Sequence, residues 1–393
     1  ENIFNNTSNI IQGNERVLKA RLYDARFFWE SDISVSLHKY GEELAKIVFH
    51  TKLGSIKDQV DRITLLVSTI GRYVPSANDE VLKRAAALCK ADLNTEMVNE
   101  FPELQGVMGK YYALAQGEEN LVAEAICNHY APLSSSASCP TEVHSVCLAL
   151  SDKIDALVGM FAAGERASGS KDPFALRRRA LGVVRLILEN DLRLSLMKVV
   201  QSSIKTYESQ GIECHSDVAS DVMVFILERF KVYLRDLGLR HDIIAASFAV
   251  SNDSDLRRLK LKSEALQKFL SSSDGVTLLS LYRRATNIVG IEEEKHNKSY
   301  RGSVAPELLS KPAEKALYEN LELIEKEIAA AVVNEDFELV MKTVADLGTG
   351  VARFFDEVKV NIKDERIRIN RLCLLGRVEP LLKSIADLSV IEG

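Results

Sequence analysis

Residues 217–237 read DVASDVMVFILERFKVYLRDL and carry the clearest structural signal in the sequence. Asp217 precedes the apolar pattern, where a carboxylate can accept the free backbone N–H groups of a helix start. The apolar residues recur every three or four positions, which places them on one face of a helix: Val222, Phe225, Ile226, Phe230, Tyr233 and Leu237. The stretch therefore predicts a capped helix with one packed face.

The same period recurs on both sides of this stretch. Residues 312–331 begin with a proline, which suits the first turn of a helix, and residues 336–357 again gather apolar side chains on one side. Residues 58–92 divide into two apolar helices separated by a polar break at 71–78. Only residues 358–362 have an extended pattern. With 20 Gly and 8 Pro in 393 residues, the sequence predicts an all-α fold.

Three polar breaks are long enough to separate larger parts of the chain, at residues 133–141, 164–173 and 203–216. A chain of 393 residues is more often two domains than one. We place the boundary in the last break, which predicts domains at residues 1–207 and 208–393.

Composition restricts the class of protein. The net charge is −6, so a nucleic-acid contact has to come from local basic faces. The six cysteines form no CxxC pair, and no apolar run approaches the roughly 20 residues that span a bilayer. These features predict a cytoplasmic protein with reduced thiols. The Asn-rich start without a methionine leads us to expect a longer natural protein.

Two aspartates, Asp92 and Asp152, lie on predicted helices. Their setting resembles the HD superfamily of metal-dependent phosphohydrolases, with Ala91-Asp92 where that family has His-Asp. Residues 57–62, where an upstream histidine would fall, contain none. Two carboxylates without imidazole ligands hold a divalent ion weakly. We therefore interpret Asp92 and Asp152 as a degenerate HD site, paired with nearby bases, with neither a metal nor a catalytic residue. A working HD-type phosphohydrolase is the alternative.

Three segments carry a closer resemblance: GNERVLKARLYDARFF at 13–28, KADLNTEMVNEFPELQG at 90–106 and GSKDPFALRR at 169–178. They are similar to segments of the bacterial glycyl-tRNA synthetase β subunit, in the same order along the chain. The resemblance implies a partner α subunit, in an α2β2 assembly, that carries the active site and activates glycine with ATP. It implies that this chain holds glycine tRNA and binds no cofactor of its own.

Residues 166–198 contain eight basic side chains against three acidic ones, which could follow a phosphate backbone. Lys171, Arg177 and Arg178 surround a turn at a predicted helix start, where cations and free backbone N–H groups can bind a phosphate. A solvated or salt-bridged helix face is the alternative, and we would favour it without the resemblance. With it, we predict that these three residues contact tRNA.

The segments RFFDEVKV at 353–360 and DERIRINRLCLL at 364–375 resemble the helical anticodon-binding domain of arginyl- and cysteinyl-tRNA synthetases. Unstacked anticodon bases are read by flat cations and amides. The resemblance therefore implies tRNA contacts at five side chains: Arg366, Arg368, Asn370, Arg371 and Arg377. Helical spacing places Phe354 and Phe355 in the core.

Taken together, the sequence predicts a degenerate HD-like helical domain followed by an anticodon-binding helical domain. We expect a tRNA-binding part of glycine–tRNA ligase, which attaches glycine to its tRNA using ATP, with neither membrane nor DNA as a partner. A helical scaffold that binds only protein is a further alternative. We expect Arg371→Ala to weaken tRNA binding without affecting folding, and Asp92→Asn or Asp152→Asn to leave charging nearly intact.

Overall fold

The structure, a computed structural model, describes residues 3–169, 171–250 and 253–392. Glu1 and Asn2 of the Asn-rich start, and Ser170 of the segment at 169–178, lie outside the described residues. The chain divides into two compact units, Glu1–Phe230 and Lys231–Gly393, called here the N-terminal and C-terminal units. The all-α prediction is confirmed, because helices make up nearly all of the regular structure in both units.

The N-terminal unit contains one short antiparallel hairpin, β1 (Val48–His50) with β2 (Gly54–Ser55), which the sequence pattern missed. Its helices are α1 (Ile3–Ile33), α2 (Leu37–Glu43), η1 (Leu44–Lys46), α3 (Ile56–Gly71), α4 (Asp79–Leu88), η2 (Ala91–Asn94), α5 (Glu96–Glu100), η3 (Pro102–Leu104), α6 (Val107–Ala115), α7 (Asn120–Asn128), α8 (Val143–Ala162), α9 (Leu176–Glu189) and α10 (Leu196–Ser209).

Helix α11 (Val218–Asp236) includes the division between the units and matches the helix predicted from residues 217–237. The C-terminal unit continues with α12 (His241–Ala249), α13 (Leu256–Leu270), α14 (Ser273–His296), η4 (Pro306–Leu308), α15 (Pro312–Val333), α16 (Phe337–Glu357), α17 (Glu365–Gly376), α18 (Val378–Lys383) and η5 (Leu388–Val390). Residues 358–362, predicted as extended, form no strand. No described helix is both long and apolar enough to cross a membrane.

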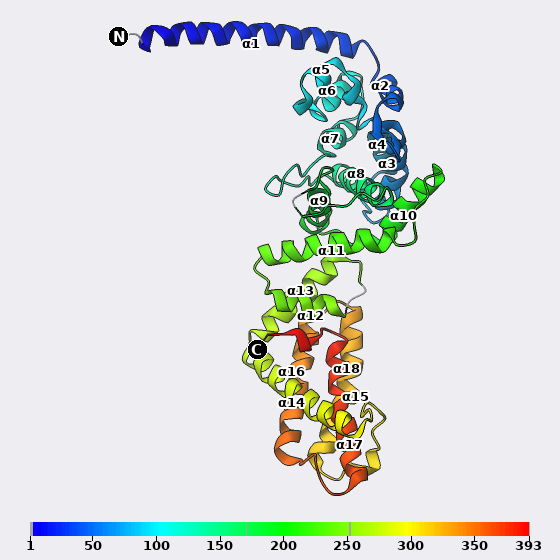
Figure 1. The fold of residues 1–393 in the computed structure, drawn as a ribbon, viewed down its shortest axis with the longest axis vertical. Helices are drawn as coiled ribbons and strands as arrows, with labels where there is room; N and C mark the ends of the chain where they lie inside the picture. The colour runs from blue at the N-terminus through cyan, green and yellow to red at the C-terminus, as the bar shows by residue number, and fades with distance from the viewer. Residues whose placement is uncertain (1–2, 170, 251–252, 393) are drawn as a thin grey trace. The chain divides into compact units, whose positions relative to one another are not determined.

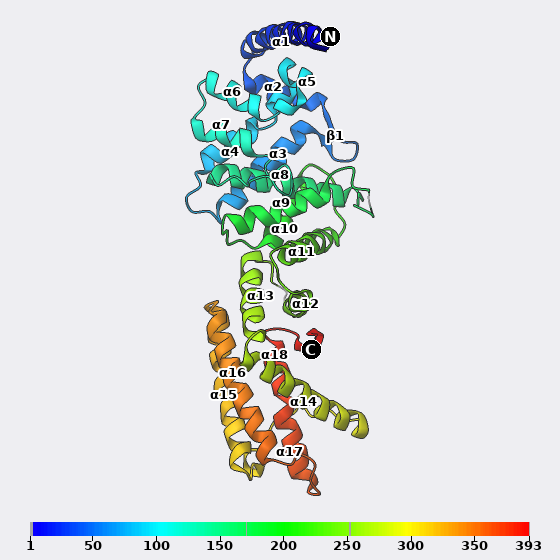
Figure 2. The same cartoon turned by 90° about the vertical axis from the view of Figure 1, so that its left-hand side faces the viewer.

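Helix α8 is the central element of the N-terminal unit (Figure 2). Every residue from His144 to Phe161 is buried, because α3, α7, α9 and α10 pack around it. The charged residues of α8 therefore need partners inside the unit. The side chain of Asp155, fully buried, accepts from Arg62 Nε of α3 at 2.9 Å, and the Tyr207 hydroxyl of α10 donates to the Asp155 carbonyl at 2.9 Å.

This network explains why the units divide later than the sequence predicted. Tyr207 and Gln210 fall in the supposed linker, yet Gln210 Oε1 accepts from Arg62 at 2.7 Å. The first part of α11 also packs into the N-terminal unit, where Phe225 meets Phe161 with ring centroids 5.3 Å apart. Polar composition alone does not reveal these buried contacts. Residues 208–230 therefore belong to the N-terminal unit rather than to the second domain.

Helix α1 extends away from the rest of the N-terminal unit, as Figure 1 shows, with its C-terminal end against α5. Asp32, almost fully buried, fixes that end. Its carboxylate accepts the backbone N–H groups of Glu96 and Met97, at 2.9 and 3.0 Å, and the Tyr112 hydroxyl at 2.7 Å. The carboxylate therefore caps α5 and ties it to α1.

In the C-terminal unit, α15 and α16 lie side by side (Figure 2) and bury the apolar faces predicted for them. Asp336 caps α16 by accepting the Leu339 N–H at 2.9 Å. Phe354 is fully buried, as its spacing predicted, and Phe355 is half-buried with the Arg284 guanidinium 4.2 Å from its ring centroid. This pair of helices provides the support on which α14 and α17 pack.

Candidate nucleic-acid interface

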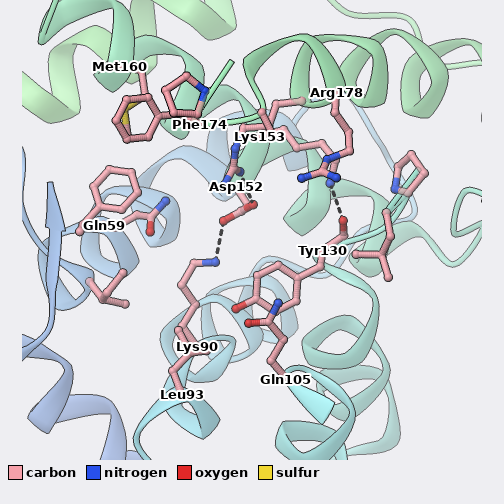
Figure 3. A pocket seen from close by; sticks show the side chains of 17 residues that line it. Gln59, Lys90, Leu93, Gln105, Tyr130, Asp152, Lys153, Met160, Phe174 and Arg178 are labelled. Atoms are coloured by element: carbon pink, nitrogen blue, oxygen red, sulfur yellow. Dashed lines mark hydrogen bonds and ion pairs between the residues drawn. The ribbon is translucent and has the colours of Figure 1, made fainter. Parts of the chain in front are cut away.

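A pocket of about 660 Å³ lies in the N-terminal unit beside α8 and α9 (Figure 3). Asp152, one of the two predicted HD-site aspartates, is on its wall. Its carboxylate meets Lys90 Nζ at 2.7 Å and Arg179 at 3.2 Å. Burial alone would raise the pKa of Asp152, but the charges of Lys90 and Arg179 hold it well below its usual range. The interpretation that Asp152 is paired with nearby bases is confirmed.

Asp92 has a different role. One carboxylate oxygen accepts the backbone N–H groups of Gly106 and Gly109, at 2.5 and 3.0 Å. The other has no hydrogen-bond partner in the described residues. A Cβ on Gly109 would lie 3.1 Å from the carboxylate, so this close approach favours glycine. The expectation of a basic partner is therefore wrong for Asp92, which holds a backbone turn instead.

The donor set does not fit a metal centre. No group of three or more His, Cys, Asp or Glu side chains within residues 3–169, 171–250 and 253–392 is arranged to hold an ion. His129 donates from Nδ1 to the Ile126 carbonyl at 2.7 Å, and burial lowers its pKa to about 3. His144 is occupied by Glu142 and by the backbone N–H of Asn78. Nothing in this arrangement favours the phosphohydrolase alternative.

Asp92→Asn is expected to flatten the dependence of stability on pH. Burial raises the pKa of Asp92 from 3.8 to about 6, a change equivalent to about 3 kcal/mol. A carboxyl with a raised pKa contributes stability below its unfolded pKa and loses that contribution as the pH rises through its folded pKa. An asparagine can still accept both N–H groups but does not ionise.

Urea unfolding at pH 5 and pH 7.5 measures this effect. As the pH rises from 5 to 7.5, the natural chain should lose stability on the order of 1 kcal/mol through Asp92, and the Asp92→Asn variant should not. Asp24→Asn, at an exposed aspartate of α1, is the control and should follow the natural chain. An equal change with pH for Asp92→Asn and the natural chain would show that Asp92 does not titrate in this range.

Of the three tRNA contacts predicted in this region, Arg177 and Arg178 lie on α9 and Lys171 precedes it. Lys171 and Arg178 are exposed and Arg177 is half-buried, and none of the three makes an ion pair within the described structure. However, Asp172 accepts the backbone N–H groups of Leu176 and Arg177, at 2.7 and 3.0 Å. The prediction that these N–H groups are free for a phosphate is therefore wrong. The side-chain cations remain available.

Asn370 and Arg371 do not face solvent, which corrects their predicted role as tRNA contacts. The Asn370 amide accepts from Ala305 N at 2.7 Å and donates to Ala305 O at 3.0 Å. Arg371 pairs with the buried Glu314 and donates to the Lys359 carbonyl at 2.8 Å. Each residue is only 5% exposed. The basic side chains of α17 were predicted to be exposed because the sequence does not show that α14 and α15 pack against this helix.

The other three predicted residues have different environments. Arg366 is exposed, with no ion pair in the described part of the chain. Arg377 meets Glu322 at 2.7 Å and Glu325 at 2.8 Å, so its charge is neutralised by two carboxylates of α15. Arg368 is half-buried, and its Nε has no hydrogen-bond partner among the described residues.

Arg368 lines a second cavity, of about 550 Å³, in the C-terminal unit. We call it the basic hollow, and its cations are Lys295 of α14, Lys359 and Lys363 between α16 and α17, and Arg368 of α17. None of these four cations makes an ion pair within residues 3–169, 171–250 and 253–392. The hollow's one acidic side chain is Glu292, which meets His296 at 3.4 Å and accepts from Asn361 Nδ2 at 3.3 Å. The hollow is therefore strongly positive.

Sequence reasoning missed the three lysines. Lys359 is in the first quoted segment and Lys363 follows it directly before the second, and their position beside DERIRINRL was a usable signal. Lys295 is distant in sequence, and only the packing of α14 against α17 brings it to the others. The buried residues support this arrangement, because Arg371 holds the Lys359 carbonyl while Asn361 is fixed on Glu292. Arg371 is thus a positioning residue for the hollow.

Comparison with known proteins accounts for both units. Residues 1–249 match the family model of the glycyl-tRNA synthetase beta subunit, and residues 278–392 match that of the DALR anticodon binding domain. The basic hollow lies within the second match, which confirms the resemblance of this region to an anticodon-binding domain.

Curated relatives extend the first match over the whole chain. A glycine–tRNA ligase beta subunit of Ruegeria sp. is 44% identical over 393 residues, which is 99% of this chain and 56% of the relative. Those of Rhodospirillum centenum and Cereibacter sphaeroides are 43% and 41% identical, over 98% of this chain and 54% and 56% of the relatives. The chain spans about half the length of the curated relatives it matches. With these matches, the chain belongs to the glycyl-tRNA synthetase beta subunit family.

Proposed function

We propose that this chain is the tRNA-binding part of a glycine–tRNA ligase β subunit, and that the basic hollow meets the anticodon arm of glycine tRNA. The observation that carries the proposal is the group of unpaired cations in the hollow, inside the segment that matches an anticodon-binding domain. A protein with net charge −6 does not attract RNA as a whole. A local excess of cations is what gives RNA a place to bind.

The chemistry of the hollow suits a splayed single-stranded loop. Its lysines can neutralise phosphates, and binding then releases the counterions that surround the RNA. The Arg368 guanidinium is flat and can stack on an unstacked base, and its unpartnered Nε supplies a donor. A volume of about 550 Å³ is large enough for a nucleotide. Lys171, Arg177 and Arg178 of the N-terminal unit would add phosphate contacts elsewhere on the tRNA.

The proposal assigns the chemistry of the ligase to a partner. The α subunit would bind ATP and glycine and form the aminoacyl adenylate, in a cytoplasmic α2β2 enzyme, while this chain would require no cofactor of its own. Because binding and chemistry are on different chains, variants of the hollow should affect tRNA use and spare glycine activation.

The complete enzyme, with its α subunit, tests this separation. We expect the double variant Lys359→Ala/Lys363→Ala to raise the KM for glycine tRNA in charging at least tenfold, because each lost charged contact costs about 1 kcal/mol. ATP–pyrophosphate exchange with glycine, which needs no tRNA, should stay unchanged.

Lys326→Ala/Lys342→Ala is the matched control, because both lysines are exposed on helices of the C-terminal unit outside the hollow. It should charge tRNA with an unchanged KM. An unchanged KM for Lys359→Ala/Lys363→Ala as well would remove the hollow from the tRNA site.

A further inference from the structure

We propose that the pocket beside α8 and α9 binds the phosphate of a nucleotide, with the base or ribose against its aromatic wall. This site is separate from the basic hollow, lies in the other unit, and does not depend on the proposed contact with the anticodon arm. The ligand can come from two sources with the same chemistry, a free nucleotide or a phosphorylated end of an RNA.

The first argument is the charge inside the pocket. Four cations line it, Lys90, Lys153, Arg178 and Arg179, against the single carboxylate of Asp152. Figure 3 shows Lys90, Asp152, Lys153 and Arg178 around the same space. Asp152 pairs with only two of the cations, Lys90 and Arg179. Because an uncompensated charge is costly to bury, an anion entering this pocket would be strongly attracted.

Lys153 is the most deeply buried source of this positive charge that has no carboxylate partner among the described residues. It is 3% exposed, and its ammonium donates to the carbonyls of His129, Tyr130 and Ala131, at 3.5, 3.1 and 2.7 Å, rather than to a carboxylate. Burial lowers the pKa of Lys153 to about 8, so the side chain is still largely charged at pH 7. The carbonyl dipoles hold the cation without cancelling its charge. The pocket therefore keeps its positive excess at neutral pH.

The second argument is an amide that no other described side chain or backbone group engages. Gln59 of α3 lines the pocket and makes no side-chain hydrogen bond within the described residues, and its amide is not among the fully enclosed polar atoms, so it is accessible from the pocket. Figure 3 shows Gln59 on the wall across the pocket from Tyr130. A phosphate can accept from its NH2 group, and a base or ribose can bond both its NH2 group and its carbonyl oxygen.

The third argument is the shape and composition of the wall. Tyr130 and Phe174 present aromatic surface, and Leu93 and Met160 add apolar surface. A volume of about 660 Å³ is in the range of small-molecule sites, which combine apolar walls with a few polar groups. A phosphate beside Lys90 and Lys153 leaves this surface for a base or ribose. Asp152 is engaged by two cations, so it is not available to activate water, and the pocket binds its ligand without hydrolysing it.

Calorimetric titration of the full chain tests the site with AMP, adenosine, inorganic phosphate and a short RNA carrying a 5′-phosphate. We expect AMP or the RNA to bind, phosphate to bind more weakly, and adenosine not to bind. Tighter binding of the RNA would identify an RNA end as the source, and tighter binding of AMP a free nucleotide.

Two variants separate binding from folding. Gln59→Leu breaks no hydrogen bond within the described protein, so it should fold as well as the natural chain and weaken nucleotide binding about fivefold. Arg178→Ala removes an exposed cation and should weaken binding about tenfold, whereas Arg72→Ala, at an exposed arginine outside the pocket, should not. Three results would each overturn the proposal. They are the absence of detectable binding by any phosphate ligand at millimolar concentration, binding by both pocket variants as tight as that of the natural chain, and release of phosphate from AMP.

Discussion

Replacing Lys295, Lys359 and Lys363 by alanine together is expected to weaken binding of glycine tRNA about 100-fold at moderate salt. Each lysine is exposed in the basic hollow and makes no ion pair within the described structure, so its charge is available to a phosphate. A charged contact contributes about 1 kcal/mol, and three contribute about 3 kcal/mol, which corresponds to the 100-fold change.

The same variant should change the response to salt. Each phosphate contact adds about 0.7 to 0.9 to the slope of log affinity against log salt concentration, so losing three should reduce the slope by about 2. Filter-binding titrations at several salt concentrations measure both quantities. Lys268→Ala/Lys326→Ala/Lys342→Ala changes the net charge equally at exposed helix positions outside the hollow, and should leave affinity and slope nearly unchanged. Equal losses in the two triple variants would mean that RNA responds only to total charge.

Arg371→Ala is expected to reduce the free energy of unfolding of the C-terminal unit by about 3 to 5 kcal/mol, because it leaves a buried carboxylate without its partner. Arg371 and Glu314 are almost fully buried and bonded to each other, and Arg371 also holds the Lys359 carbonyl. This expectation replaces the one drawn from the sequence, that Arg371 could be changed without affecting folding. Weaker tRNA binding should accompany it, because the Lys359 segment loses its support.

Urea unfolding of four variants, Arg366→Ala, Arg371→Ala, Glu314→Gln and the double variant of the last two, separates these effects. Arg366→Ala, at an exposed position of the same helix, should change stability by no more than about 0.5 kcal/mol. The double variant Arg371→Ala/Glu314→Gln should lose less than the sum of its single variants, because neither charge is then left alone. A loss below 1 kcal/mol for Arg371→Ala would show that the pair is open to water.

Helix positions were predictable because each depends on a local apolar period. Residues 312–331 and 336–357 became α15 and α16 with nearly the predicted bounds. The hairpin of β1 and β2 was missed because five strand residues carry too short a pattern to stand out.

The candidate sites were less predictable, because a cation's role depends on what packs against it. Arg366 and Arg371 lie on one helix with the same charge, yet one is exposed and the other is buried on Glu314. Glu314 and Glu322 come from α15, which no local pattern on α17 reveals. The same limit hid Lys295, since only the packing of α14 on α17 places it in the hollow.

Recognition of the anticodon by the hollow is tested most directly by coupling a change in the protein to a change in the RNA. Affinities of the natural chain and of Lys295→Ala/Lys359→Ala/Lys363→Ala should be measured for glycine tRNA and for the same tRNA with altered anticodon bases. We expect the altered anticodon to weaken binding to the natural chain about tenfold or more and to change binding to the triple variant by less than about threefold. An equal loss in both proteins would show that the anticodon is read elsewhere and that the hollow is not its site.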